Sequence, residues 1–368
     1  MEEMLIFLES IPDCRQEWKV QHKLSEVVLI VLLATLANAD DWQEIGVFAN
    51  CNEELLRRYM KLENGIPSHD TIQRVMANVQ PEYIQRYMLI WNELLERDEG
   101  EKLKKLLSID GKTIRGNASK NQEALHVVSA WSKEDGICFG QKGVNGKGKE
   151  IPAIKELLDI VEVKDRIVTI DAIGTQKTIV EKIIKGKGDY VIAVKENQPN
   201  LCRDIELYFE DKEHLDNSSY YKTIEKAHSQ GEKREYWQTE DISWFEDKEK
   251  WCGLASIGMT KNTLYREGHT VEECRYYISS LKDEVKEFAR SVRGHWAVES
   301  MHWHLDVTFR EDKNQTLEKT AAMNLNIIRK WSLAILKILD LGKKYSMKKK
   351  RFALSCSFAK NIEKLMNL

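Results

Sequence analysis

The chain has 368 residues, which is too long for one ordinary hydrophobic core and therefore predicts at least two domains. Its 42% hydrophobic and 31% charged residues are typical of a soluble globular protein. The net charge of −3 disfavours a generally basic nucleic-acid binder, although the distribution of charge matters more than its sum.

Cysteine usage and apolar runs indicate where such a protein works. The seven cysteines are scattered without a CxxC pair, which disfavours a disulfide framework or a cysteine zinc site and indicates a reducing compartment. Met1 is followed by two glutamates, so we expect no signal peptide. The longest apolar run, residues 27–37, is too short to span a bilayer. We therefore expect a cytoplasmic protein with no membrane partner.

The first 98 residues predict a small all-helical domain. Residues 24–38 form a strongly apolar helical stretch, and Asp40 and Asp41 are suited to cap the helix that follows it. Ser68 is a good N-cap for a helix over residues 69–77, and Pro81 is suited to open another. The charged segment 97–105 predicts a linker to a second domain.

From residue 106 the pattern changes to alternating strands and helices. We predict strands over residues 106–109, 126–132, 137–144, 167–170 and 190–194, with helices over 151–161 and 175–184. This order predicts a three-strand meander followed by two parallel strands, because a right-handed crossover returns the fourth strand beside the first. Residues 200–285 predict a β-rich insertion, and helices are expected over 285–309 and 317–341.

Two aspartates follow buried strands in this scheme. Asp110 comes after the apolar residues 106–109, before a predicted turn over residues 111–113, and Asp171 comes after residues 167–170. Ionised aspartate is rarely buried unless it is paired or bound to a metal. If the two strands are parallel neighbours, both carboxylates lie at the edge where α/β sheets bind ligands.

A third acid lies on the predicted helix over residues 293–312. At helical spacing, Glu299 shares one face with His295, Trp303 or His302, Asp306 and Arg310. A solvated amphipathic helix would explain the charges, but it explains less well the density of tryptophan and histidine. Three carboxylates suit a pair of Mg²⁺ ions, which prefer oxygen ligands and promote phosphoryl transfer. Asp110 is our candidate for the ligand shared by both ions, because a strand holds it rigidly.

Several long motifs resemble the DDE transposases of insertion sequences, and more narrowly the H-repeat-associated proteins. They are SIDGKTIRG (108–116), TIDAIGTQ (169–176), DYVIAVKENQP (189–199), RGHWAVESMHWHLDVTFRED (293–312) and, in the front segment, DWQEIGVF (41–48) and SHDTIQRV (68–75). The resemblance covers nearly the whole chain. It implies an α/β fold with a ribonuclease-H-like mixed sheet, in a catalytic domain over residues 99–345. A helical N-terminal domain that binds DNA ends (1–98) and a basic C-terminal tail or helix (346–368) flank it.

The resemblance also implies the chemistry. In that family the residues matching Asp110, Asp171 and Glu299 bind Mg²⁺, for which Mn²⁺ can substitute, with two ions per site. They cleave double-stranded DNA at the transposon ends and join the freed 3′-hydroxyl to target DNA. A homodimer is implied because two ends must be brought together, and the protein is expected at the nucleoid when bound to DNA.

One departure from the wider family concerns contacts with DNA. Many relatives carry Tyr seven residues before the Glu, Arg four before it and Lys seven after it, where this chain has Val292, His295 and Asp306. His295, Arg293 and Arg310 are candidates to supply the missing phosphate contacts. Further candidates lie just past the predicted first and fifth strands near the site or on the helix of Glu299; they are Lys112, Arg115, Lys195 and Trp303.

Rival interpretations are weaker. Residues 143–149 match GxxxxGK, but Glu150 stands where a phosphate-binding loop needs Ser or Thr, so no nucleotide cofactor is expected. Two ExxH pairs resemble di-iron bundles, but His126 begins a predicted strand. Two functional alternatives stay open: a decayed relative that binds DNA without cutting it, and a nuclease that cuts without joining.

Overall fold

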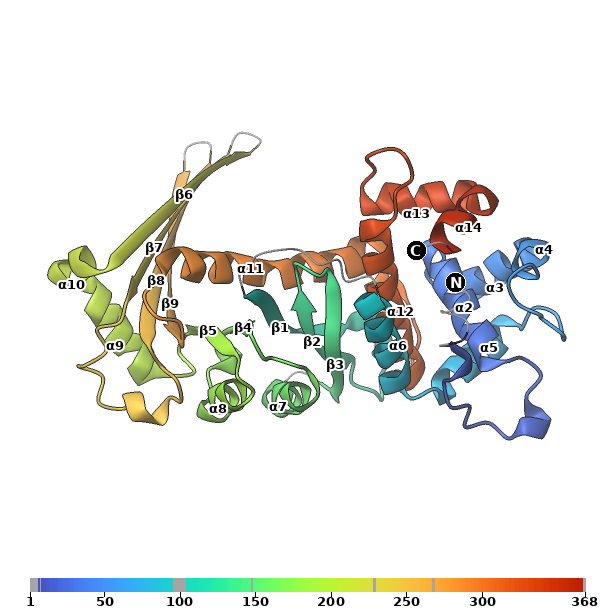
Figure 1. The fold of residues 1–368 in the computed structure, drawn as a ribbon, viewed down its shortest axis with the longest axis horizontal. Coiled ribbons are helices and arrows are strands. Elements are labelled where there is room, and N and C mark those ends of the chain that lie inside the picture. The colour runs from blue at the N-terminus through green and yellow to red at the C-terminus, as the bar shows by residue number, and fades with distance from the viewer. Residues whose placement is uncertain are drawn as a thin grey trace.

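The computed structural model describes residues 6, 8–94, 104–146, 148–227, 230–266 and 269–366. It is a mixed α/β protein built on one nine-stranded sheet with helices on both faces and a helical unit at one end (Figure 1). Among these residues, no helix is both long and apolar enough to cross a membrane. Residues 95–103, which hold most of the predicted linker, and Lys147 lie outside the described residues.

The sheet has the strand order β3-β2-β1-β4-β5-β9-β8-β7-β6. The predicted meander consists of β1 (Lys105–Ile114), β2 (Leu125–Ser132) and β3 (Ile137–Asn145), which pair antiparallel. On its other side β1 pairs parallel with β4 (Arg166–Ile170), and β4 pairs parallel with β5 (Asp189–Val194). The structure therefore confirms the meander and the two parallel strands that the sequence predicted.

The β-rich segment extends the same sheet. After α9 (Pro199–Glu210) and α10 (Lys212–Asn217) come β6 (Ser219–Ala227), β7 (Gln230–Thr239), η4 (Lys248–Lys250), β8 (Ser256–Arg266) and β9 (His269–Ser279). These four strands are antiparallel, and β9 joins them to β5 through the register Val191↔Ser279 to Val194↔Tyr276. The segment is thus β-rich as predicted, and it continues the sheet next to the two parallel strands.

The predicted turn at residues 111–113 is wrong. β1 continues to Ile114, because β2 pairs with it all along this stretch, from Asp110↔Ser129 to Ile114↔Leu125. The parallel partner β4 stops earlier, and its last pair with β1 is Ile109↔Ile170. The residues after Asp110 are therefore held by hydrogen bonds on one side only, which leaves the other side open next to Asp171.

Helices cover the two faces of the sheet. Figure 1 shows α11 (Val285–Trp303) along one face, with α7 (Glu150–Ile160) and α8 (Lys177–Lys185) along the other. Strand alternation separates two cores: Leu106 and Ile167 pack with Phe288 of α11, whereas their neighbours Leu107 and Val168 pack with the α7 and α8 side chains. Gly294 lets α11 approach closely, because a Cβ there would lie 2.1 Å from Leu106 Cδ1.

The helical unit combines both ends of the chain. Its N-terminal elements are η1 (Glu17–Lys19), α2 (Leu24–Leu36), α3 (Trp42–Cys51), α4 (Glu53–Leu56), α5 (His69–Asn78) and α6 (Pro81–Leu94). They share one hydrophobic core with α12 (Lys319–Ile338), α13 (Met347–Cys356) and α14 (Phe358–Met366). As predicted, Asp41 and Ser68 cap α3 and α5. The proposed domain boundaries at 98 and 345 remain predictions, and this core includes residues from both sides of each.

The C-terminal residues, expected to be a basic tail or helix, form two helices that are packed onto the helical unit. Arg351 of α13 is fully buried, and its guanidinium donates to the carbonyl of Thr35 at 3.0 and 2.8 Å and to Asp40 Oδ1 at 2.9 Å. A buried arginine that donates to a carbonyl of α2 holds α13 against that helix.

Candidate active site

The parallel ladder between β1 and β4 ends just before two aspartates. Its last pair is Ile109↔Ile170, so Asp110 and Asp171 are the next residues on two neighbouring strands. Alternation places Asp110 on the same face of β1 as Leu106, which packs against α11. Asp171 caps η3 (Ala172–Gly174) by accepting from the Ile173 N–H at 3.2 Å. Both carboxylates therefore lie at the same end of the two strands, on the side of the sheet that α11 covers.

Burial and several other acidic side chains affect the charge of the Asp110 carboxyl. Burial raises the pKa of its carboxyl to about 7, and the negative charges of Asp171, Glu150 and Glu299 add to this rise. The Gly111 N–H, which donates to Asp110 Oδ1 at 2.8 Å, opposes it. The structure thus brings Asp171 and Glu299, together with Glu150, into electrostatic range of Asp110.

Glu299 lies on α11, on the side of the helix that faces the end of the parallel ladder. Burial raises the pKa of its carboxyl, and the charge of Arg275 on β9 lowers it. The same helix turns the imidazole of His295 inward, where Nδ1 lies 3.0 Å from Thr169 Oγ1 on β4. Burial lowers the pKa of His295 to about 4, so this ring is neutral near pH 7.

The donor set suits a hard divalent cation. Within the described ranges, no three His, Cys, Asp or Glu side chains lie close enough together to hold a metal ion as they stand. The three carboxylates nevertheless supply oxygen ligands on one side of the sheet. Burial and the neighbouring negative charges raise the pKa of Asp110, and a bound cation would favour its charged form.

Sequence reasoning missed Glu150 as part of this site. It begins α7 on the opposite face of the sheet, and its Oε1 lies 2.9 Å from Nε2 of His126 on β2. The pair packs against Gly111, where a Cβ would lie 2.4 Å from that nitrogen, and the charge of Glu150 contributes to the raised pKa of Asp110. The sequence singles out Glu150 only because it stands where a phosphate-binding loop needs Ser or Thr, and no spacing rule links it to Asp110.

His302 is a second residue that the sequence left unassigned. Its Nδ1 lies 3.5 Å from Asp110 Oδ2, one turn beyond Glu299 on α11. Burial lowers the pKa of this imidazole to about 3, with help from the positive charges of Lys330 and Lys112. A neutral ring beside Asp110 can accept or donate one hydrogen bond without adding charge to the acidic site.

The predicted DNA contacts fall into two groups. Arg115, Lys195, Arg293, Trp303 and Arg310 are exposed around the site. Of these, Arg310 has its Nε 3.5 Å from Asp40 Oδ2, and Arg293 lies on α11 at the rim of a cavity. The side chains of Lys112 and His295 are instead drawn into the protein. Lys112 Nζ lies 2.8 Å from Asp306, 3.0 Å from Glu311 and 3.3 Å from Asp312.

Comparisons with known proteins show the family of this chain. A family described as "Transposase DDE domain" matches residues 101–335, and one described as "DDE_Tnp_1-associated" matches residues 5–92. The protein named "Putative transposase YncI" of Escherichia coli O157:H7 is 37% identical over 379 residues, which cover 98% of this chain and 94% of that protein. The "H repeat-associated putative transposase YhhI" of Escherichia coli strain K12 is 35% identical and covers 95% of both chains.

A shorter relative carries a different description. "Inactive transposase YbfQ" of Escherichia coli strain K12 is 39% identical over 77 residues, which are 21% of this chain. The matched family covers most of the sheet and α11, and the full-length relatives extend over the helical unit as well. The chain therefore belongs to the transposase DDE domain family, and it resembles the H repeat-associated putative transposases along nearly its whole length.

Proposed function

We propose that this protein is a DNA transposase with a ribonuclease-H-like core that uses Mg²⁺ to cleave the ends of an insertion sequence and join them to target DNA. The observation that carries the proposal is the placement of Asp110 and Asp171 side by side where the β1–β4 ladder ends, with Glu299 on the helix above them. Family membership supports the same reaction class.

Each carboxylate has a distinct structural setting in this proposal. Asp110 is held by a strand that is paired on both sides up to residue 109 and on one side beyond it, which suits it to be a ligand shared by two ions. Asp171 is fixed by the turn that it caps, and Glu299 by the long helix α11. Two bound Mg²⁺ ions would activate the attacking oxygen and stabilise the leaving oxygen of an in-line displacement.

The substrate in this proposal is double-stranded DNA, from the element ends first and the target afterwards. Exposed Arg115 and Lys195 lie just past β1 and beside β5, where they can contact backbone phosphates without reading sequence. Joining two ends in one reaction requires two active sites, so we propose that the protein works as a homodimer on its DNA.

The direct test is cleavage of DNA that carries the sequences flanking this reading frame, with and without Mg²⁺. Asp171→Asn keeps the size of the side chain and its capacity to accept from Ile173, but it removes the charge. We expect this variant to lose cleavage and joining while it still binds DNA. Asp216→Asn, at an exposed position on α10, is the matched control and should cleave normally.

Three other outcomes would contradict parts of the proposal. Metal-dependent cleavage that persists in Asp171→Asn would remove this carboxylate from the site. Cleavage by the unaltered protein without joining would identify a nuclease, and DNA binding with no cleavage in Mg²⁺ or Mn²⁺ would identify a decayed relative.

A further inference from the structure

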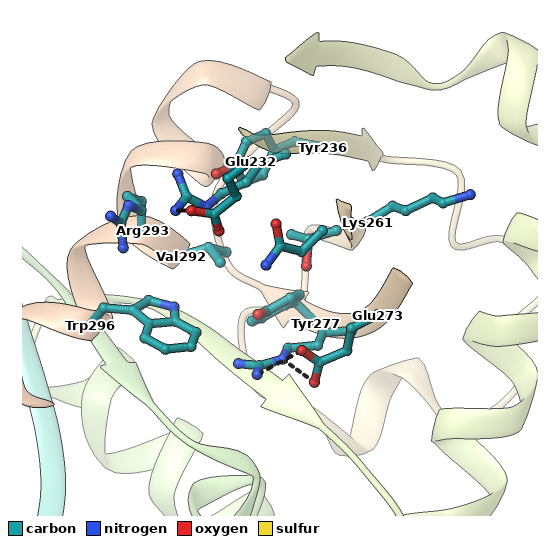
Figure 2. A pocket seen from close by; sticks show the side chains of 12 residues that line it. Glu232, Tyr236, Lys261, Glu273, Tyr277, Val292, Arg293 and Trp296 are labelled. Carbon is teal, nitrogen blue, oxygen red and sulfur yellow. Dashed lines mark hydrogen bonds and ion pairs between the residues drawn. The ribbon is translucent and has the colours of Figure 1, made fainter. Parts of the chain in front are cut away.

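A cavity of about 300 Å³ lies between the β-rich segment and α11. Figure 2 shows Trp296 and Arg293 projecting from α11 on one side of it, with Tyr236 and Tyr277 from β7 and β9 opposite. Trp296 is one helical turn before Glu299, so the cavity opens beside the candidate active site. It combines aromatic and cationic side chains, which is the chemistry that receives a nucleic-acid backbone.

Two cationic side chains that line this cavity, those of Arg234 and Lys261, are paired with glutamates. Arg234 Nη1 lies 3.1 Å from Glu225, and its other nitrogen pairs with Glu232. Lys261 Nζ lies 2.9 Å from Glu272, and in Figure 2 its side chain extends away from the cavity. These pairs connect β6 with β7 and β8 with β9.

Arg275 on β9 has a different position. Its guanidinium lies 5.1 Å from the ring centroid of Trp296, a cation–π contact that directs it toward α11. Glu273 accepts from its Nε at 2.9 Å and from its Nη2 at 3.1 Å, so neither of these two bonds uses Nη1. The Arg275 side chain is therefore held by the Glu273 carboxylate and the Trp296 indole, and its Nη1 takes no part in the two hydrogen bonds to Glu273.

Helix α11 itself provides little positive charge beside Glu299. Four residues before it, His295 is turned into the sheet toward Thr169. Seven residues after it, Asp306 is paired with Lys112. Arg275 contacts Trp296, one helical turn before Glu299, and so brings positive charge to this helix from the β-rich segment.

We propose that Arg275 is a phosphate-binding residue of the active site, and that its guanidinium holds one DNA backbone phosphate beside Glu299 from the β-rich segment. Guanidinium groups bind phosphate through two parallel hydrogen bonds, and the clamp by Glu273 and Trp296 lowers the entropy lost on binding. The inference deepens the proposed function, since it rests on Glu299 belonging to a site for DNA chemistry. It also makes the β-rich segment part of that site.

The test measures DNA binding in EDTA, so that no cleavage takes place. The probe is a short labelled duplex of the DNA flanking the reading frame, and the dissociation constant is followed over a series of salt concentrations. Each phosphate neutralised by the protein contributes about 0.9 to the slope of log affinity against log salt concentration. We expect Arg275→Gln to bind more weakly and to lower this slope by about 0.9, and Arg275→Lys to keep the slope.

Arg203→Gln is the matched control. Arg203 is also an arginine paired with a nearby glutamate, Glu206 at 2.8 Å, but it lies on α9, which packs on the face of the sheet opposite α11. It should leave affinity and slope unchanged. An unchanged slope in Arg275→Gln, or an equal loss in Arg203→Gln, would overturn the proposal, because a purely structural arginine would not alter one phosphate contact.

A second measurement does not depend on the folding of any variant. Single methylphosphonate substitutions neutralise one backbone phosphate at a time, and binding of each duplex to the unaltered protein is compared. We expect a lowered slope at a phosphate next to the cleaved bond, and its absence there overturns the proposal. An unaltered protein that binds with this pattern but never cleaves would refute the proposed function alone.

Discussion

Removing the charge of Asp110 should stabilise the metal-free protein. Its carboxyl has an ordinary pKa of 3.8, which the folded structure raises to about 7. Because the folded protein binds this proton more tightly than the unfolded chain, the carboxyl stabilises the fold below pH 3.8, and this contribution is lost as pH rises through about 7. The difference corresponds to about 4 kcal/mol at alkaline pH.

Asp110→Asn removes this penalty and keeps an oxygen that can accept from the Gly111 N–H. At about pH 8 in EDTA, its free energy of unfolding in urea should exceed that of the unaltered protein by up to about 4 kcal/mol, and at about pH 5 by less than half of that. The neighbouring His302 does not titrate in this range, since its pKa is lowered to about 3.

Two controls complete this experiment. Asp216→Asn on the exposed side of α10 should leave the difference between the two pH values unchanged. Mg²⁺ added at about pH 8 should stabilise the unaltered protein more than Asp110→Asn, because only the carboxylate set can bind it. An Asp110→Asn protein that is no more stable than its parent at about pH 8 would refute the convergence of carboxylates on this residue.

Two further predictions concern buried contacts, one in the helical unit and one beside the candidate site. Arg351→Met should lower the free energy of unfolding by about 3–5 kcal/mol, because it leaves Asp40 buried without its guanidinium; urea denaturation measures this, and exposed Lys349→Met should change it by less than about 0.5 kcal/mol. Gly111→Ala should cost about 1–3 kcal/mol, since its Cβ would lie 2.4 Å from His126 Nε2. His126→Ala in the same chain should restore part of that loss, and a Gly111→Ala protein of unchanged stability would contradict the close packing at this strand.

The order of elements could be predicted from the sequence because each core strand has its own apolar pattern. Residues 106–109 and 167–170 are continuous apolar or small runs, as expected of strands covered on both faces. The end of β1 could not be predicted in the same way. Gly111, Lys112 and Thr113 have the composition of a turn, and only the pairing with β2 makes them strand.

The acidic set of the site was predictable in part. Asp110 and Asp171 follow the two parallel strands directly, so topology alone makes them neighbours. Glu150 lies on α7, packs against Gly111 and acts on the Asp110 carboxyl by its charge, a relation that no sequence spacing encodes. Arg275 is separated from Glu299 by the rest of β9 and most of α11, and only the folded sheet brings them together.

Lys112 illustrates how alternation along a strand can predict the face of a residue without predicting its partner. The sequence suggested a DNA contact for Lys112 because it follows the predicted first strand near the metal ligands, and in the structure it lies within β1 on the same face as Asp110. After α11 the chain turns through η5 (His304–Thr308), Arg310 at a φ of 49°, and η6 (Glu311–Lys313), which brings three acids to the ammonium of Lys112.

One of these acids continues the network inward. Glu311 is fully buried, accepts from Asn326 at 2.8 Å and lies 3.4 Å from Arg329, both on α12. Its burial and the charges around it leave the ammonium of Lys112 strongly bound, and the pKa of Lys112 is raised even though burial alone would lower it. Lys112 thus ties the strand that carries Asp110 to the chain that follows Glu299.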